Sequence, residues 1–263
     1  MLRYIKTYIA SILFIYLILF GWIGSYQINC TATLFLVVVL LIISYSFIEL
    51  KMQERLCFRD CFLKDSSIFA KMLSSKWLVT IIYIIISIIM TISAVTSSIY
   101  IDSKIWLYIF TLHTIFVIML LRGFDYLLYG SIKDSHRGLI AREWTINISS
   151  IVLILVTIYI YYNGYEPTYL ESGLEESIIN ASNEVSSNCI LMESILKIER
   201  EIDALFWWVI TNSSEHIESS LLKLGAWLLF LLFNSLAILG INRFIVQVVY
   251  MIDIIFKEKR SER

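Results

Sequence analysis

Six long apolar runs constrain the fold of this chain more than any other feature of its sequence. Each approaches the roughly 20 residues that an α-helix needs to cross the apolar core of a bilayer. A lipid-exposed strand would leave backbone N–H and C=O groups without partners, so even the isoleucine-rich third run is expected to be helical. The sequence therefore predicts an all-α, polytopic membrane protein. Its six predicted transmembrane helices are about 7–25, 32–49, 77–98, 105–121, 147–163 and 222–241.

The composition agrees with this class. Hydrophobic residues make up 59% of the chain and charged residues 16%, with a mean hydropathy of +0.78. These values are typical of membrane proteins and leave little water-facing surface. The net charge of −1 gives no basic excess, so nucleic acid is not expected as a partner. The expected surroundings are a lipid bilayer.

The distribution of basic residues predicts the orientation of the bundle. The N-terminus, loops 51–76 and 122–146 and the tail from Arg243 carry 17 of the 21 Lys and Arg residues. Lys and Arg accumulate on the cytoplasmic side of membrane proteins. An even number of spans places both termini on one side. We therefore expect a multi-pass protein of the inner (cytoplasmic) membrane with both termini in the cytoplasm.

The expected domains follow from this topology. Residues 1–163 form a five-span bundle, 164–220 a small helical extracytoplasmic domain, and 221–263 the sixth span with a cytoplasmic amphipathic tail. The extracytoplasmic segment is acidic, with 11 Asp and Glu residues against 2 Lys and Arg. The apolar run 244–256 in the tail is too short to cross again. It either continues span six as a protruding helix or bends at Gly240 into an interfacial helix.

The two basic loops are expected to contain amphipathic helices. Loop 51–76 alternates basic residues with Leu, Phe and Ile at helical spacing, a pattern that suits the surface of an anionic inner leaflet. A cytosolic partner is the other interpretation. Loop 122–146 is interpreted as a short helix, a Gly-Ser turn and a second helix that leads into span five.

One amphipathic helix is predicted within the acidic domain. Apolar residues recur at intervals of three and four, which places them on one stripe of a helix. This stripe has three interpretations. It packs within its own domain, against a second copy of the chain, or against another protein. Two tryptophans follow, and tryptophan favours the membrane–water boundary. The predicted partner-binding residues are Leu191, Ile195, Ile198, Ile202, Leu205, Val209, Trp207 and Trp208.

The four cysteines divide between the two sides. Cys30 and Cys189 both lie on the extracytoplasmic side, where an oxidising environment permits a disulfide between them; two free thiols are the alternative. Cys57 and Cys61 lie on the inner side, with His136 in the next inner loop. A structural metal site needs about four ligands in recognisable pairs, and none are evident. No metal or cofactor is expected.

Polar residues near the centre of a span are candidates for function because they are costly in lipid. His113 lies near the centre of span four and Asn234 at a similar depth in span six. A hydrogen bond between them would join two helices, which is the commoner role of such pairs. Lining a path for protons or ions is the alternative.

The sequence lacks the motifs of common enzyme classes. It contains no H-E-x-x-H, no G-x-S-x-G and no Walker glycine loop, and its three histidines are scattered. We therefore expect a non-enzymatic interaction or sensor protein that anchors or signals to a partner across the membrane. Phage defence, toxin immunity and exclusion are accessory roles of this kind. A homo-oligomeric ion or proton channel that uses His113 and Asn234 is the alternative function.

Overall fold

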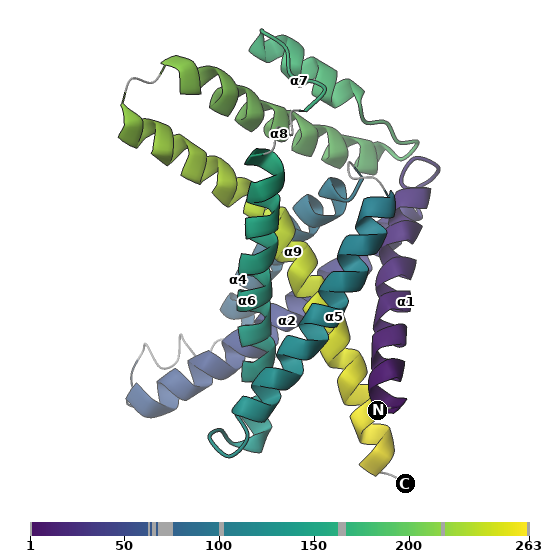
Figure 1. The fold of residues 1–263 in the computed structure, drawn as a ribbon, viewed down its shortest axis with the longest axis vertical. Helices are drawn as coiled ribbons and strands as arrows, with labels where there is room; N and C mark the ends of the chain where they lie inside the picture. Colours follow the sequence, from purple (N-terminus) through teal and green to yellow (C-terminus); the bar gives the residue numbers. More distant parts are fainter. Residues whose placement is uncertain are drawn as a thin grey trace.

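The computed structural model describes residues 2–62, 64, 67, 76–99, 103–162, 167–216 and 219–261, and all secondary structure among them is helical. Figure 1 shows how the helices are arranged. Their bounds are α1 (Leu2–Ser25), α2 (Ala32–Phe62), α4 (Lys76–Ser97), α5 (Ser103–Leu127), α6 (Asp134–Tyr162), α7 (Leu174–Asn183), α8 (Ile190–His216) and α9 (Ser220–Ser261).

Six of these helices are long and apolar enough to cross a membrane, which confirms the predicted fold class. They are α1, α2, α4, α5, α6 and α9, and the two remaining helices, α7 and α8, lie between spans five and six. Both chain termini lie at one end of the bundle, and α7 and α8 cover the other end (Figure 1). We call these the terminal end and the capped end.

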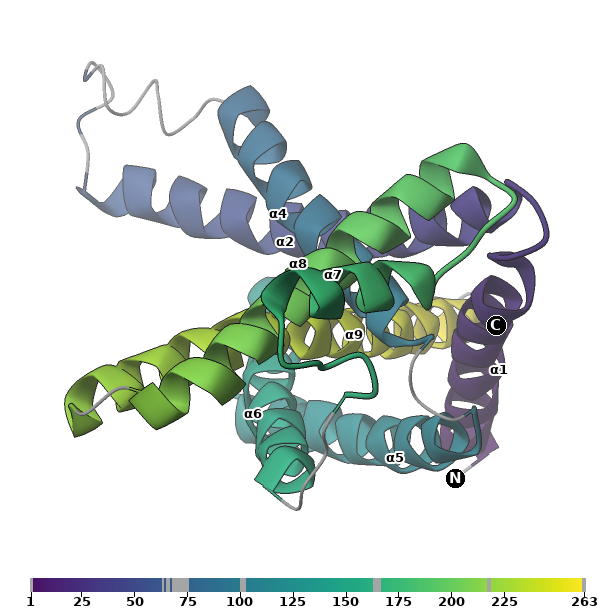
Figure 2. The same cartoon turned by 90° about the horizontal axis from the view of Figure 1, so that it is seen from above.

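Helix α9 is the centre of the bundle. It packs against each of the other five spans, and it also contacts α8 at the capped end. Seen from above, α9 runs between α2 and α4 on one side and α5 and α6 on the other (Figure 2). Residues 240–249 of α9 are all buried, which is unusual for a span and explains why the polar side chains of this stretch meet protein rather than lipid.

The helix of the sixth span continues past the predicted end of that span. Helix α9 runs over Ser220–Ser261, whereas the sequence suggested a span over 222–241. The predicted end depended on Asn242 and Arg243, which are too polar for lipid. In the structure both side chains are buried and hydrogen-bonded to neighbouring helices, so they interrupt neither the helix nor the span.

Gly240 is a packing site and not the bend that one interpretation of the tail required. The helix continues through Gly240 without a break to Ser261. A Cβ atom at this position would lie 2.5 Å from the backbone oxygen of Met90 in α4. Only glycine allows the backbones of α4 and α9 to come this close. The run 244–256 therefore continues the helix of span six, and the interpretation in which the chain leaves this helix at Gly240 is wrong.

The connections at the terminal end are partly described. A short turn joins α5 to α6, and Gly130 in it has a φ of +81°, a conformation that glycine adopts readily. This is the Gly-Ser turn expected within 122–146, and the rest of that segment is helical. Helix α2 extends to Phe62, so it includes the first part of loop 51–76. Most of 63–75 lies outside the described residues.

The capped end has its own small core, formed by both the segment before α9 and the start of α9 itself. The ring of Trp207 meets that of Phe230 edge to face, with centroids 4.7 Å apart. Because Phe230 belongs to α9, this helix contributes to the small core of the capped end as well as to the bundle. The buried residues of this core are Tyr169, Ala181, Ala204, Trp207, Ile210 and Phe230.

Candidate functional site

A cluster of four charged side chains lies inside the bundle near its terminal end. Arg243 of α9 donates to both carboxylate oxygens of Glu143 in α6, at 3.3 and 3.1 Å. Both side chains are about nine-tenths buried. The Arg243 guanidinium also lies 3.7 Å from the centre of the Phe47 ring in α2. One ion pair thus joins α6 to α9, and the cation packs against α2.

The second ion pair of the cluster joins α6 to α2. Arg142 is fully buried and forms a hydrogen-bonded ion pair with Glu49. Its other terminal nitrogen donates to the backbone oxygen of Ser46 at 3.1 Å. An unpaired ion in this environment would cost several kcal/mol, whereas removing one partner of a buried pair typically costs about 3–5 kcal/mol. The cluster therefore strongly favours one arrangement of α2, α6 and α9.

A second polar cluster is centred on Asn242, the neighbour of Arg243. Its Oδ1 lies 2.7 Å from Nε2 of His113 in α5 and accepts a hydrogen bond from Ser149 at 3.0 Å. Its Nδ2 donates to the Ile146 backbone oxygen and to Ser150 at 2.9 and 2.7 Å. Four bonds satisfy the amide completely. The cluster joins α5, α6 and α9.

The sequence identified His113 correctly as a buried polar residue, but the structure gives it a different asparagine. Asn242 is the partner of His113, and the side chain of Asn234 lies outside the described residues. Arg142 and Glu143 were assigned to an inner loop, and Arg243 to the tail. Their charge pointed to water, and no sequence pattern showed that they compensate one another across three helices.

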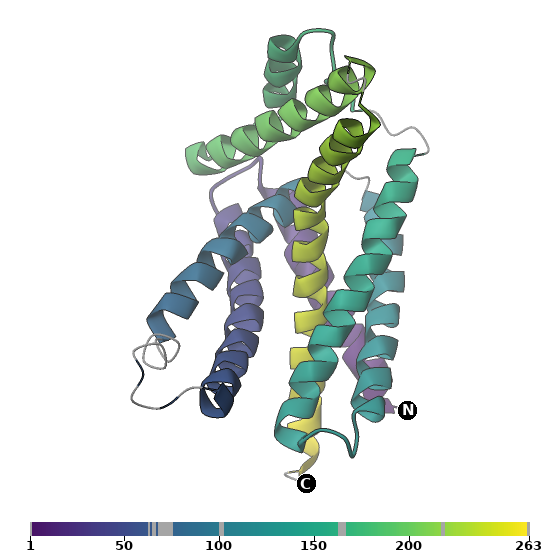
Figure 3. The same cartoon turned by 90° about the vertical axis from the view of Figure 1, so that its left-hand side faces the viewer.

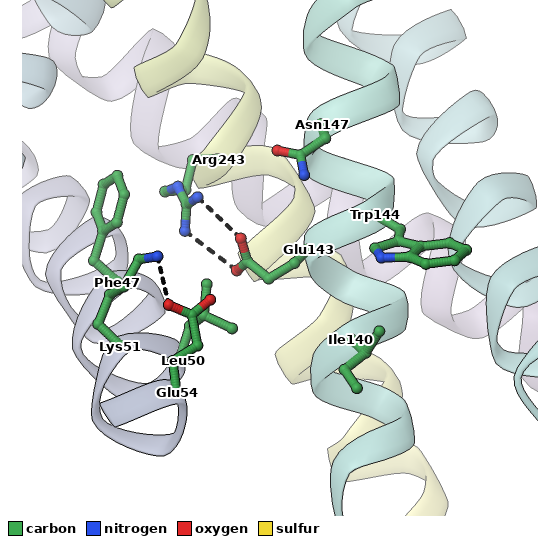
Figure 4. A pocket seen from close by; sticks show the side chains of 9 residues that line it. All are labelled: Phe47, Leu50, Lys51, Glu54, Ile140, Glu143, Trp144, Asn147 and Arg243. Carbon is green, nitrogen blue, oxygen red and sulfur yellow. Dashed lines mark hydrogen bonds and ion pairs between the residues drawn. The ribbon is translucent and has the colours of Figure 1, made fainter. Parts of the chain in front are cut away.

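A pocket of about 450 Å³ lies beside the charged cluster, between α2 and α6 and in front of α9 (Figure 4). The pair Arg243–Glu143 lies on its inner wall. A second ion pair, Lys51–Glu54, lies on the α2 side with its charged atoms 2.6 Å apart. Trp144 extends from α6 and is half exposed. The pocket therefore offers both signs of charge to a ligand.

Helix α8 buries a face that the sequence did not predict. Its core-facing side includes Arg200, which pairs with Glu184 and Asp203 and lies 4.3 Å above the Tyr169 ring. Because these partners neutralise Arg200, a charged residue can occupy a buried position. The buried residues of α8 are Met192, Leu196, Arg200, Ala204, Trp207 and Ile210.

The predicted apolar stripe of α8 is largely uncovered. Ile195 is partly buried against the bundle core, and Val209 is 39% exposed. Four further side chains are between 39% and 60% exposed. They share one side of the helix and form what we call the exposed α8 face. These four residues are Leu191, Ile198, Ile202 and Leu205.

The two tryptophans of α8 both make contacts within the capping layer. Trp207 is buried in the small core against Phe230, so it is not available to a partner. Trp208 is partly buried, and its indole N–H donates to the backbone oxygen of Ser172 at 3.3 Å. The ring of Trp207 thus contacts α9, whereas that of Trp208 contacts the segment before α7.

Two carboxyl groups of α8 have shifted acidities. Burial raises the pKa of Glu199 to about 7, and the nearby charge of Asp203 adds to this effect. The Oε2 atom of Glu199 is buried without a hydrogen-bond partner among the described residues. Burial also raises the pKa of Asp203, which a hydrogen bond from Tyr169 partly opposes. Glu199 is therefore half protonated near neutral pH.

A disulfide between Cys30 and Cys189 ties the start of α8 to the α1–α2 turn, with the two Cα atoms 5.0 Å apart. The backbone N–H of Asn188 donates to the Gln27 oxygen at 3.2 Å beside it.

Cys57 is a free, exposed thiol. His136 pairs with Gln53 at 3.0 Å, and no group of three or more metal-ligating side chains occurs within the described parts of the chain.

The exposed α8 face and the pocket beside the charged cluster are thus the two candidate functional surfaces. Comparison of the chain with family models, with curated proteins and with solved structures found no match.

Proposed function

We propose that this protein is a non-enzymatic membrane interaction protein that binds a partner protein with the exposed α8 face. One observation carries the proposal. Four large apolar side chains lie uncovered on one side of a helix outside the bundle, although the same helix buries the charged Arg200. An amphipathic helix that binds another protein presents its anchor residues at spacings of three, four and seven positions.

Charge favours a basic partner over a second copy of this chain. The segment 164–220 carries 11 acidic and 2 basic residues. Two such surfaces repel one another at close approach, whereas a basic surface is attracted and its approach is accelerated. The apolar face would supply the contact, and the surrounding carboxylates would select and orient the partner.

The fold offers a route by which binding at the capped end can act at the terminal end. Helix α9 contributes Trp227 and Phe230 to the capping core and continues to Arg243 in the charged cluster. We propose that the terminal end is cytoplasmic, because most Lys and Arg residues are expected there. The protein would then anchor or signal to a partner across the inner membrane, as accessory proteins of phage defence, toxin immunity or exclusion do.

The experiment that tests this function replaces Ile198 and Ile202 by aspartate. We expect the double variant to lose its biological phenotype and to release any protein that co-purifies with the wild type in mild detergent. Ile179→Asp is the matched control, because Ile179 is 51% exposed on α7 and lies off this face. Loss of function in the control, or full function in the double variant, would refute the proposal.

A homo-oligomeric channel or transporter is the second candidate, because His113 and Asn242 are buried polar groups within the membrane span. The saturated hydrogen bonds of Asn242 favour a role in joining helices. For this role we expect His113→Ala to lose about 1 kcal/mol of stability and to keep its phenotype. Ion flux through reconstituted protein that disappears in His113→Ala would instead favour the channel.

A further inference from the structure

The pocket beside the charged cluster lies at the side of the bundle, since Glu54 and Trp144 in its lining are about half exposed. Figure 3 shows α2 and α6 on either side of α9. The pocket lies in the space that these three helices bound, with Arg243 at its inner wall and Lys51 and Trp144 on its two sides (Figure 4). A lateral opening faces the place that lipid occupies around a transmembrane bundle. Its ligand is therefore expected to arrive from the membrane.

The height of the pocket matches a lipid headgroup. Lys51 follows Ala32, the first residue of α2, by 19 residues. At about 1.5 Å per residue this is roughly 28 Å along the helix. The apolar core of a bilayer is about 30 Å thick. If α2 begins at one boundary of the apolar core, Lys51 and Glu54 lie at the other, where headgroups meet acyl chains.

The charges of the pocket select a zwitterion. Lys51 and Glu54 form one neutral pair, and Arg243 and Glu143 form another. A ligand with a net negative charge meets two carboxylates here, and a ligand with a net positive charge meets two cations. A headgroup with one phosphodiester and one ammonium matches both pairs, because charge-assisted hydrogen bonds are the strongest ones available.

The carboxylate acceptors of the pocket indicate which type of headgroup ammonium it binds. Glu54 is half exposed and presents carboxylate oxygens, which accept hydrogen bonds from a primary ammonium. A quaternary ammonium has no N–H to donate and is usually held in an aromatic cage. Here the Arg243 guanidinium already covers the Phe47 ring, which leaves Trp144 as the aromatic wall on the α6 side.

The surface beyond the pocket suits an acyl chain. Towards the capped end, Leu41 of α2 and Ile148 and Ile151 of α6 are exposed. On α9, residues 235–239 are partly exposed. We infer that the pocket between α2 and α6 binds a zwitterionic phospholipid with a primary ammonium, of the phosphatidylethanolamine type, from the leaflet at the terminal end.

The test is native mass spectrometry of the full-length protein after equilibration in nanodiscs with equal amounts of phosphatidylethanolamine, phosphatidylcholine and phosphatidylglycerol. We expect retained adducts to favour phosphatidylethanolamine about tenfold, the effect of one or two charge-assisted hydrogen bonds. The variant Lys51→Gln/Glu54→Gln should lose this preference. Lys64→Gln/Glu175→Gln is the matched control, because it removes two exposed charges outside the pocket and should keep the preference.

Three results would overturn the inference. One is equal retention of the three lipids by the wild type. Another is an unchanged preference in Lys51→Gln/Glu54→Gln, provided that its thermal unfolding matches that of the control. The third is binding of soluble glycerophosphoethanolamine as tightly as the whole lipid, since this would make the pocket a site for a soluble zwitterion. Weak competition by the soluble headgroup supports the lipid.

Discussion

At the scale of single residues, each buried arginine in the described part of the chain has a carboxylate partner. Glu143 binds Arg243 inside the bundle, and Arg200 binds Glu184 in the capping layer. These residues mark where sequence reasoning failed, because a hydropathy pattern counts each charge alone. A pair separated by 100 positions in the chain leaves no local signal. The position of His113 was predictable, since a lone histidine within an apolar run is a local feature.

Removing one partner of the Glu143–Arg243 pair should destabilise the protein more than removing both partners. Glu143→Leu leaves the Arg243 guanidinium buried beside Ser46 without its carboxylate. We expect the free energy of unfolding to fall by about 3 kcal/mol, and by clearly less in Glu143→Leu/Arg243→Leu. Unfolding in mixed micelles, followed by tryptophan fluorescence, measures both values. Lys133→Leu, at an exposed lysine, controls for the loss of a charge. A double variant no more stable than the single one contradicts the account.

Glu199 should make the capping layer sensitive to pH. Its pKa of about 7 in the folded state lies above the ordinary value of 4.5, so the folded state binds this proton more tightly than the unfolded state. The contribution of Glu199 to the free energy of unfolding is then greatest below pH 4.5. It is lost as the pH rises through 7, and it amounts to at most about 3 kcal/mol. The raised pKa of Asp203 acts in the same direction.

Thermal unfolding between pH 5 and 8 measures this effect. Glu199→Gln should flatten the profile and raise the melting temperature at pH 8, because the amide needs no proton. Glu175→Gln, an exposed site on α7, should leave the profile as it is. Equal slopes in the Glu199→Gln variant and the wild type would show that another group is responsible.

At the scale of the element, α8 shows how far periodicity can be used. The spacing of Leu191, Ile198 and Ile202 correctly predicted a helix. It did not predict which side is buried, because the core-facing side contains Arg200 and the apolar side is exposed. The exposed α8 face is more apolar than the buried face of the same helix. Because leaving apolar side chains in water is unfavourable, we expect a partner to cover it.

The disulfide should hold α8 in place. Cys30 and Cys189 are 159 residues apart in the chain, so the bond restricts the unfolded state strongly. We expect Cys189→Ser to lose about 2–4 kcal/mol of stability and to speed proteolysis between α7 and α8. Cys57→Ser is the control, because Cys57 is an exposed free thiol. Identical proteolysis of the two variants would mean that noncovalent contacts suffice.

At the scale of the whole molecule, the sequence predicted six spans and a helical layer between the last two, and the structure has both. This is so because apolar runs of about 20 residues have no other stable form in a bilayer. The central position of α9 was not predictable. It depends on the pairing of Asn242 and Arg243 with other spans and on the close approach of α4 at Gly240.

The central claim, that the exposed α8 face binds a basic partner protein, is tested most directly by site-specific photo-crosslinking in living cells. A photoreactive residue at Ile198 should give a discrete adduct with a protein of different mass, and one at Glu175 on α7 should give none. The adduct should disappear when Ile202→Asp is added. Adducts only with lipid, or only between two differently tagged copies of this chain, would contradict the claim.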